Sequence, residues 1–352
     1  MKVIKSILVY FFIGANIATI LLLWASCAVT YLHPEHFPRL TVLTLAFPAF
    51  LIVNVLFVIF WLIFKVKRVW IPLVGLLACG SFVRDYFPIN LPSTPTDSTW
   101  TVISYNSRNW GGKDADLEDG KNVVLNFLLA SNAHIICMQE TTQKKDYHQQ
   151  MQEQGYEYLN KREYTVFSRL PILSADTLAL SGHSAHALRA FLLDGQDTIM
   201  LINQHLRSNK LSQEMKEAYK DALSQHESDS IKKELVPILR LLSVASPIRA
   251  AQADSLTSII EAWLPRPVIV CGDINDTPIS YTYRVQAHHL TNAYCQSGNG
   301  VGFTFQEKGF PVRIDHILFS DDHWKSYETR VERSISCSDH FPILTKLVKK
   351  TP

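Results

Sequence analysis

Two long apolar runs dominate the first part of the chain, Ile7–Leu32 and Thr41–Phe64. Neither contains a charged residue, and each exceeds the ~20 residues that a helix needs to cross the hydrocarbon core of a bilayer. A third, shorter run, Val69–Phe82, is followed by Arg84 and Asp85. The pattern predicts two transmembrane helices, and a third if the shorter run also crosses.

We therefore expect a membrane region over residues 1–88. A cleaved signal peptide is the alternative for the first run, which follows the basic residues Lys2 and Lys5. The apolar core of a signal peptide usually has only ~7–15 residues, and here a second long run follows. An uncleaved, multi-pass membrane anchor is the better interpretation.

Basic residues flank these runs unevenly. One group precedes the first run and another separates the second run from the third: Lys2, Lys5, Lys65, Lys67 and Arg68. The loop between the first two runs has Arg39 as its one basic residue. The positive-inside rule then places the N-terminus and the 65–68 loop in the cytoplasm. Three spans put the rest of the chain on the extracytoplasmic, periplasmic side, whereas two spans leave it in the cytoplasm.

The remainder of the chain reads as a linker and one layered domain. Residues 89–98 are rich in Pro, Ser and Thr, which is typical of a linker. Beyond them, short β-branched and aromatic runs alternate with helical stretches such as Lys121–Ala130. The clearest of these runs are Trp100–Tyr105, His134–Met138, Tyr164–Phe167, Thr198–Asn203, Pro267–Cys271, Arg313–Phe319 and Ile343–Val348. The alternation predicts an α+β domain of sheets and helices over residues 99–350.

A helical insertion is expected at about residues 210–250. The composition is strongly helical from there to Trp263, and Gln213–Ala222 and Asp254–Trp263 are its clearest pieces. One interpretation is a set of helices that covers the sheet. The other is an insertion that lies over the active site or against the membrane.

Charge is distributed as in a membrane anchor joined to a soluble domain. Of the 34 basic and 32 acidic residues, residues 1–96 hold seven and two, which leaves 27 and 30 for residues 97–352. A net-acidic soluble part argues against tight nonspecific binding to nucleic acid, although it does not exclude a nuclease. The six Cys form no CxxC pair or Cys/His cluster, which argues against zinc ribbons and thioredoxin-like sites.

Chemistry-bearing residues collect where the predicted strands end. The apolar run ending at Cys271 leads into Gly272, Asp273 and Asn275. On extended backbone Asp273 and Asn275 share a face, where a carboxylate and an amide can hold a water and a phosphoryl oxygen together. A plain turn at the strand end is the alternative, because Asp and Asn are common turn residues.

A second group combines carboxylates and histidines. Asp315 sits inside an apolar strand, where an unpaired carboxylate is costly. His340, which follows Asp339 in a loop, is a suitable partner, and the carboxylate would hold the imidazole protonated. We expect an Asp315–His340 pair.

Three more polar residues end strands: Asn106, Glu140 and His205. A carboxylate and an amide oxygen are hard ligands that suit Mg²⁺ rather than zinc. For His205 alone, an ordinary hydrogen-bonded histidine is the simpler interpretation.

In chain order, these motifs resemble those of the endonuclease/exonuclease/phosphatase superfamily, which has the deoxyribonuclease-I-like fold. The resembling elements are the strand ending in Asn106, Gln139-Glu140, His205-Leu206, Gly272–Asn275, Ile314-Asp315 and Ser338–His340. The resemblance implies an α/β (α+β) four-layer α/β/β/α sandwich in a membrane-anchored, bacterial-type member. Two features depart from the family: His316 replaces its usual aromatic residue, and the helical stretch after His205 is longer than in its compact nucleases.

The resemblance also implies site roles. The metal site would hold Mg²⁺ (or Mn²⁺) through Glu140, with Asn106 and Asp339 nearby. The catalytic residues would be Asp273, Asn275, His340, Asp315 and His205. Asp273 would orient or deprotonate the attacking water, and His340, polarised by Asp315, would donate to the phosphate. Whether Asp273 or His340 is the base stays open.

The sequence thus predicts a membrane-anchored, divalent-metal-dependent hydrolase of phosphate esters, most simply a phosphodiesterase. A Mg²⁺-dependent nuclease and a noncatalytic membrane-bound binding module are the alternatives. The substrate would be a lipid, a small phosphodiester or a nucleic acid, and no protein partner is predicted. Cys295 and Cys337 would be able to pair in an extracytoplasmic domain, if they are close in space.

Overall fold

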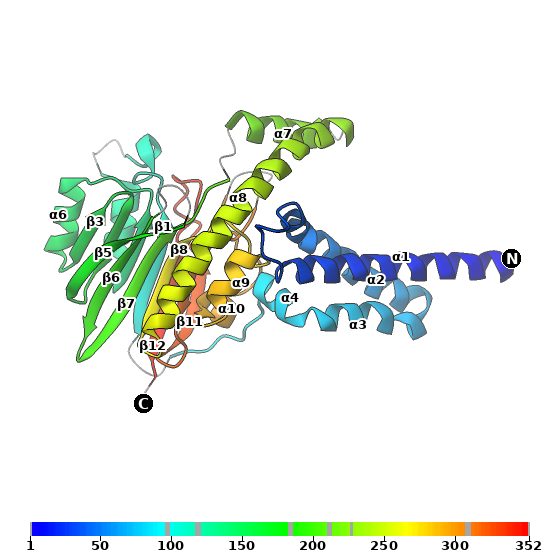
Figure 1. Cartoon of the computed structure of the whole chain (residues 1–352), viewed down its shortest axis with the longest axis horizontal. Coiled ribbons are helices and arrows are strands. Elements are labelled where there is room, and N and C mark those ends of the chain that lie inside the picture. The colour runs from blue at the N-terminus through cyan, green and yellow to red at the C-terminus, as the bar shows by residue number, and fades with distance from the viewer. Residues whose placement is uncertain are drawn as a thin grey trace.

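The structure is a computed structural model that describes residues 2–95, 99–116, 121–181, 186–209, 213–225, 228–306 and 311–350. Helices from the first part of the chain project from one side of a body that contains the sheets (Figure 1). The N-terminus lies at the far tip of this projection.

Two six-stranded sheets form the body. The first has the order β11-β12-β1-β2-β4-β3, with the strands β1 (Thr99–Asn106), β2 (Ile135–Gln139), β3 (Glu157–Lys161), β4 (Tyr164–Ser168), β11 (Trp324–Val331) and β12 (Ile343–Lys349). The second has the order β5-β6-β7-β8-β10-β9, with β5 (Ile172–Ala179), β6 (His186–Asp194), β7 (Asp197–His205), β8 (Val268–Asp273), β9 (Thr291–Asn292) and β10 (Asp315–Phe319).

The sheets pack face to face and helices cover both outer faces. Buried side chains from both sheets, such as Val102 and Leu201, form one apolar core between them. The outer face of the first sheet buries a second core beneath the helices α5 (Val123–Ser131) and α6 (Lys145–Glu153). A third core lies between the second sheet and the helices α8 (Ser228–Trp263) and α9 (Tyr281–Ala287). These layers confirm the predicted four-layer α/β/β/α sandwich.

The predicted membrane region contains two helices long and apolar enough to span a bilayer, over Ser6–Val29 and Leu40–Phe64. Its elements are α1 (Lys2–Val29), η1 (Leu40–Ala46), α2 (Phe47–Phe64), η2 (Val66–Arg68), α3 (Trp70–Ala78) and α4 (Gly80–Tyr86). The third predicted run is not one straight helix. The pair Val66–Ala78 and Gly80–Tyr86 bends by 66° at a short break, as in a broken span or a re-entrant loop.

Polar side chains in this region face the inside of the helix bundle. Asn16 Nδ2 donates to Asn54 Oδ1 at 3.3 Å, and Trp61 Nε1 donates to Asn16 Oδ1 at 3.1 Å. All three side chains are buried. Polar groups in hydrocarbon need such internal partners, so this packing fits helices that lie in lipid.

The first residues of the predicted linker are bound to the sheet-containing domain. Gly300 N donates to Pro88 O at 2.9 Å, and Asn90 N donates to Asn299 Oδ1 at 2.7 Å. Just before them, Asp85 O accepts a hydrogen bond from Arg313, two residues ahead of Asp315. The end of α4 is therefore fixed against the domain.

The helical insertion has two parts. α7 (Gln213–Gln225) and the first half of α8 project from the sandwich toward the side that carries the N-terminal helices (Figure 1). The second half of α8 buries Ala253, Leu256 and Ile260 against the second sheet. The second half therefore covers the sheet, as one interpretation of the sequence has it, whereas contact of the first half with a membrane or with the active site stays a prediction.

Cys295 and Cys337 do not pair. Cys295 Sγ lies 3.6 Å from Tyr283 Oη, whereas Cys337 Sγ lies 3.9 Å from Tyr105 Oη in a different cluster of side chains. All six cysteines are free thiols.

Candidate active site

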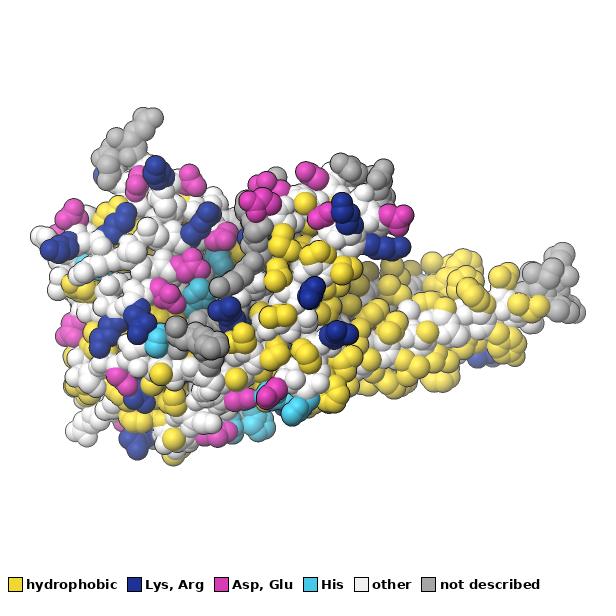
Figure 2. Space-filling model, turned by 45° about the horizontal axis from the view of Figure 1, so that its top comes forward, with side chains coloured by type: hydrophobic (Ala, Val, Ile, Leu, Met, Phe, Trp, Pro, Cys, Tyr) yellow, Lys and Arg dark blue, Asp and Glu magenta, His cyan; other side chains and the backbone are white. Residues whose placement is uncertain are grey.

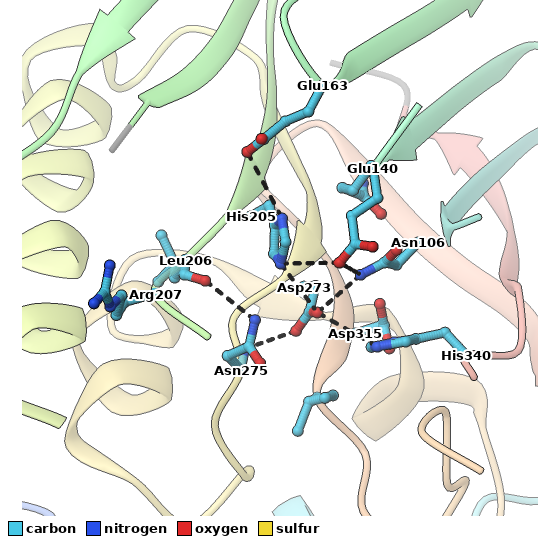
Figure 3. Close-up of polar contacts among 12 residues, drawn as sticks. Asn106, Glu140, Glu163, His205, Leu206, Arg207, Asp273, Asn275, Asp315 and His340 are labelled. Carbon is cyan, nitrogen blue, oxygen red and sulfur yellow. Dashed lines mark hydrogen bonds and ion pairs between the residues drawn. The ribbon is translucent and has the colours of Figure 1, made fainter. Parts of the chain in front are cut away.

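Strand pairing brings the predicted site residues to one edge of the sandwich. β1 and β2 are parallel, with Asn106 opposite Gln139, and β7 and β8 are parallel, with His205 opposite Asp273. Antiparallel β10 begins at Asp315, again opposite Asp273. Parallel strands end at the same edge of a sheet, so their terminal side chains converge there (Figure 3).

Gly272 makes this convergence possible. Its φ is +142°, and a Cβ atom there would lie 1.9 Å from Gln204 O on the neighbouring strand. Any side chain would force β7 and β8 apart at the position where His205 and Asp273 must meet.

Three buried groups form a chain through the site. His340 Nδ1 lies 2.8 Å from Asp315 Oδ2, which is the contact expected from the sequence, and His340 Nε2 lies 3.6 Å from Asp273 Oδ2. Asp273 and Asp315 are nearly fully buried. One imidazole thus lies between two carboxylates, as Figure 3 shows.

Burial and charge set the protonation of this chain. Burial alone would lower the pKa of His340, but the negative charges of Asp315 and Asp273 outweigh it and raise the pKa to about 10. Burial, together with the charge of Asp315, raises the pKa of Asp273 to about 6. The ring is therefore an imidazolium at neutral pH, able to donate a proton or a hydrogen bond.

Ser338 fixes the loop that carries His340. Its hydroxyl donates to Asn106 O at the end of β1, at 2.8 Å, and accepts from His340 N at 3.2 Å. Asp339 is half-buried in the same loop, with Oδ1 3.4 Å from Ser338 Oγ. Among the described contacts, no hydrogen bond or ion pair joins Asp339 to Glu140 or Asn106.

Glu140 and Asn106 face Asp273 from the first sheet. Asn106 Nδ2 donates to Glu140 Oε1 at 3.0 Å and to Asp273 Oδ2 at 3.3 Å. Glu140 has a left-handed backbone, with a φ of +52°. Asn109 N donates to Glu140 O at 2.6 Å and so holds this uncommon conformation.

His205 closes the site from β7, and Glu163 lies behind it. His205 Nε2 is 3.7 Å from both Glu140 Oε1 and Asp273 Oδ2, while Nδ1 is 3.8 Å from Glu163 Oε1. Burial opposes the charged ring, but Glu163 and the other two carboxylates together raise the pKa of His205. Sequence reasoning missed Glu163 because it lies in a turn rather than at the end of an apolar strand.

The second sheet supplies Asn275 through a turn that α8 supports. Asn275 N donates to Asp273 Oδ1 at 2.7 Å and Asn275 Nδ2 donates to Leu206 O at 3.1 Å, so the side chain bridges two loops. With a φ of +53° it has left the extended conformation that the sequence predicted. It still lies beside Asp273.

Two buried side chains of α8 hold these loops. Arg249 Nε lies 3.3 Å from Asp276 Oδ2, and Arg249 Nη1 donates to Arg207 O at 3.2 Å. Gln252 Oε1 accepts from Arg207 N at 2.9 Å. Sequence reasoning did not identify either residue, because a polar residue in an amphipathic helix normally faces water.

A buried amide network under the site joins the two sheets. Gln139 Nε2 donates to Asn203 Oδ1 at 2.7 Å, and Asn203 Nδ2 donates to Met138 O at 3.0 Å and to Thr165 O at 3.2 Å. This network fixes how the strand ends of one sheet face those of the other. The sequence marked Gln139 only as the neighbour of Glu140.

His316, the departure from the family pattern, is a structural residue here. It is buried, and Nδ1 lies 3.0 Å from Asn292 Nδ2. Burial, with the charge of Arg313, holds its pKa well below the ordinary value, so the ring is neutral. It lies on β10 directly after Asp315 and points to the other face of the sheet.

The donor set fits a divalent cation. Single atoms of Asp273, Asp315 and His340 lie within 4.8 Å of one another. However, Asp315 Oδ2 and His340 Nδ1 already bond each other, so the pair is better suited to proton chemistry than to metal ligation. The oxygens of Glu140, Asp273 and Asn106 are the hard ligands that Mg²⁺ and Mn²⁺ prefer. Burial and the charge of Asp315 raise the pKa of Asp273, and the charges of His340 and His205 oppose this shift.

Two family profiles match separate parts of the chain. The endonuclease/exonuclease/phosphatase family profile matches residues 103–340, and that of a domain of unknown function matches residues 9–86. No curated protein sequence matches the chain.

Solved structures of similar fold cover the same part. The human Nocturnin catalytic domain with bound sulfate is 17% identical, with a TM-score of 0.51, over 72% of this chain and 94% of that one. D. rerio TDP2 complexed with a single-strand DNA product is 16% identical, with a TM-score of 0.50, over 72% and 100%. An endonuclease/exonuclease/phosphatase from Bacteroides vulgatus is 17% identical, with a TM-score of 0.50, over 72% and 100%. At these identities the similarity shows the fold alone.

Proposed function

The chain belongs to the endonuclease/exonuclease/phosphatase family and is a hydrolase of phosphate esters, and on that premise we propose that it is a membrane-anchored phosphodiesterase that requires a divalent metal ion. The observation that carries the proposal is the buried chain Asp315–His340–Asp273, which faces Glu140 and Asn106 across one strand-end site. A protonated donor, a poised carboxylate and hard oxygen ligands are the groups that phosphodiester hydrolysis needs.

Each residue has a role in this proposal. A Mg²⁺ or Mn²⁺ ion held by Glu140, with Asn106 and Asp339, would neutralise charge on the phosphoryl oxygens. Asp273 orients or deprotonates the attacking water, and Asn275 holds that water or a phosphoryl oxygen.

The two histidines act as donors. His340, held as an imidazolium by Asp315, donates to the phosphate, and His205 is a second donor. The contact of His205 with Glu163 keeps the His205 ring charged and oriented.

The membrane region gives the proposal its setting. We propose that residues 1–88 anchor the enzyme, that residues 89–98 connect it, and that residues 99–350 form the catalytic domain with its insertion at about 210–250. The basic residues near the N-terminus and in the 65–68 loop, with three crossings, favour an extracytoplasmic site. The path of the chain supports three crossings, because the N-terminus and the domain lie at opposite ends of the helices (Figure 1).

The decisive experiment is a substrate screen of the purified full chain in detergent. Candidate substrates are a bis-aryl phosphodiester, phosphoinositides, sphingomyelin, DNA and RNA, each with Mg²⁺ or Mn²⁺ and with excess chelator. We expect hydrolysis of a lipid or small phosphodiester, lost in chelator and in the His340→Ala protein. Hydrolysis confined to DNA or RNA would show that the protein is a nuclease. Activity that persists in chelator would disprove the metal requirement.

Glu140→Gln tests the metal site within the same assay. The substitution removes an anionic ligand but keeps the size of the side chain. We expect turnover to fall sharply and half-maximal activity to require more Mg²⁺. A variant with unchanged metal dependence would remove Glu140 from the ligand set.

A further inference from the structure

The first half of α8 has the composition of a helix that lies on a lipid surface. Residues 231–244 include eight aliphatic residues, three basic residues and one acidic residue. The basic residues Lys232, Lys233 and Arg240 are all exposed. We call residues 231–244 the α8 arm.

Apolar side chains of the arm face outward although the other side of the helix is packed. Val236 is 63% exposed and Val244 is 60% exposed, whereas Ile238 is 1% exposed. Within the described part of residues 99–350, the only other large hydrophobic side chain counted as exposed is Leu173, at 53% on edge strand β5. Exposed large hydrophobic side chains of the described domain are therefore gathered mainly on the arm.

The helix that carries the arm lies next to the N-terminal helices. α8 contacts η1, and His33 Nε2, in the loop between α1 and η1, lies 3.0 Å from Asp254 Oδ2 on the same helix. Figure 2 shows the hydrophobic side chains over α8 continuing into the hydrophobic surface of the N-terminal helices. The outward apolar face thus begins where the predicted lipid-facing surface ends.

We propose that the α8 arm docks on the surface of the bilayer that the N-terminal helices cross. Val236 and Val244 enter the boundary between headgroups and acyl chains, and the three cations contact anionic headgroups. The inference rests on the membrane anchoring in the proposed function. The single acidic residue in the arm, Glu234, leaves its charge at +2 and so favours an anionic lipid surface.

Docking of the arm would reach the active site through the same helix. One to two turns beyond Val244, Arg249 and Gln252 hold the loop that follows His205. In this arrangement, one end of α8 lies on the bilayer and the other end is hydrogen-bonded to a loop of the site. The helix would therefore set the distance and the tilt of the site relative to the lipid.

Spin labels in the full chain, reconstituted into phosphatidylcholine vesicles with and without phosphatidylglycerol, test this proposal. Val236→Cys and Val244→Cys are labelled with a nitroxide in a Cys337→Ser background, because the other native cysteines are buried. Leu173→Cys is the matched control, similarly exposed but distant from the membrane helices. Ile63→Cys, 70% exposed on α2, reports whether those helices are in lipid.

We expect nitroxides at 236 and 244 to collide often with oxygen, which concentrates in lipid, and rarely with a water-soluble nickel complex. The label at 173 should show the opposite. Labels at 236 and 244 that behave like the label at 173 would overturn the proposal. Protection from both reagents would also overturn it, because it would show that protein covers the arm.

The Ile63 label separates the two possible failures. If it is lipid-exposed while the arm labels are not, only the docking inference fails. If it is also exposed to water, the membrane anchoring fails as well. Labelled proteins must melt as the parent does, and two independent arm positions protect the test against one variant that does not fold.

The cations are tested by the combined change Lys232→Gln, Lys233→Gln and Arg240→Gln. In vesicles with phosphatidylglycerol, this variant should lose part of the oxygen accessibility at 236 and 244. The loss should be small in pure phosphatidylcholine and should also appear in the parent at high salt, because salt screens surface charge. Equal accessibility in both lipids would remove the electrostatic part of the proposal.

Discussion

His340 Nδ1 lies 2.8 Å from Asp315 Oδ2, so removal of either partner should disable the same function. We predict that Asp315→Asn and His340→Ala each lower turnover by at least ~10²-fold, the scale of one positioned acid, base or transition-state donor. Steady-state kinetics of the double variant should show little further loss, because coupled residues are not additive.

Losses that multiply would instead mean that the two side chains act independently. Asp315 is completely buried, so a structural effect must be excluded first. The circular dichroism and melting temperature of Asp315→Asn therefore have to match those of the parent.

Asp273 should make the metal-free protein sensitive to pH. Its pKa is raised from an unfolded value of ~3.9 to about 6 by burial and the charge of Asp315. The folded state therefore binds more protons between these values, and its free energy of unfolding falls as pH rises through this window. In chelator, we predict that the melting temperature falls between about pH 4 and pH 6.

Asp273→Asn should flatten this part of the melting profile, since Asn does not titrate. Mg²⁺ should raise the melting temperature of the parent by several degrees at pH 7.5 and by less at pH 5, because the ion binds the ionised carboxylate. Identical Mg²⁺ effects at both values of pH would contradict a site that includes Asp273.

Sequence reasoning found the residues that end strands and missed those that support them. Asn106, Asp273 and Asp315 follow or begin apolar runs, so local pattern alone marked them. Glu163 lies in the turn between β3 and β4, and Arg249 on an amphipathic helix. Their roles come from contacts with residues far away in sequence, which no local pattern reports.

The same distinction holds for whole elements. None of the clearest apolar runs in the sequence corresponds to an edge strand. The edge strands are β3, β5, β9 and β11. An edge strand is only half covered, as in the polar alternation of β11, so its hydrophobic signal is weak. Of the interior strands, only β6 was missed.

The long helix α8 was predicted only in pieces, and Pro237 and Pro247 inside it explain why. Proline normally ends or kinks a helix. Here packing of the second half of α8 against the sheet, together with the contacts of α8 with η1, overrides the local preference.

Arg249 gives α8 a measurable positioning role. Arg249→Met should lower both turnover and stability, because it frees the loop after His205 and leaves Asp276 without its buried cation. In the double variant Arg249→Met with Asp276→Asn, we expect the melting temperature to recover while turnover stays low. If the melting temperature and the turnover both recover, Arg249 affects activity only by stabilising the fold.

At the scale of the whole molecule, the prediction to test is the side of the membrane. Three crossings from a cytoplasmic N-terminus place the C-terminus outside. A reporter that is active only outside the cytoplasm, fused at Pro352, should be active. A silent outside reporter together with an active cytoplasmic one would reverse the topology, and the bent pair α3–α4 would then be a re-entrant loop.

The contacts of Pro88 and Asn90 with Gly298–Gly300 change what the Pro-rich segment can do. A flexible tether lets an enzyme sweep a volume that grows with tether length. Here the domain is hydrogen-bonded to the first residues of the segment, directly after α4, so the rest of the segment only connects two parts of the same domain. Inserting Gly-Ser residues at 92–95 would then cost only a little loop-closure entropy and would not extend the reach of the active site. In the proposed membrane-anchored enzyme, the active site therefore stays at a fixed distance from the bilayer, and the substrate has to reach it there.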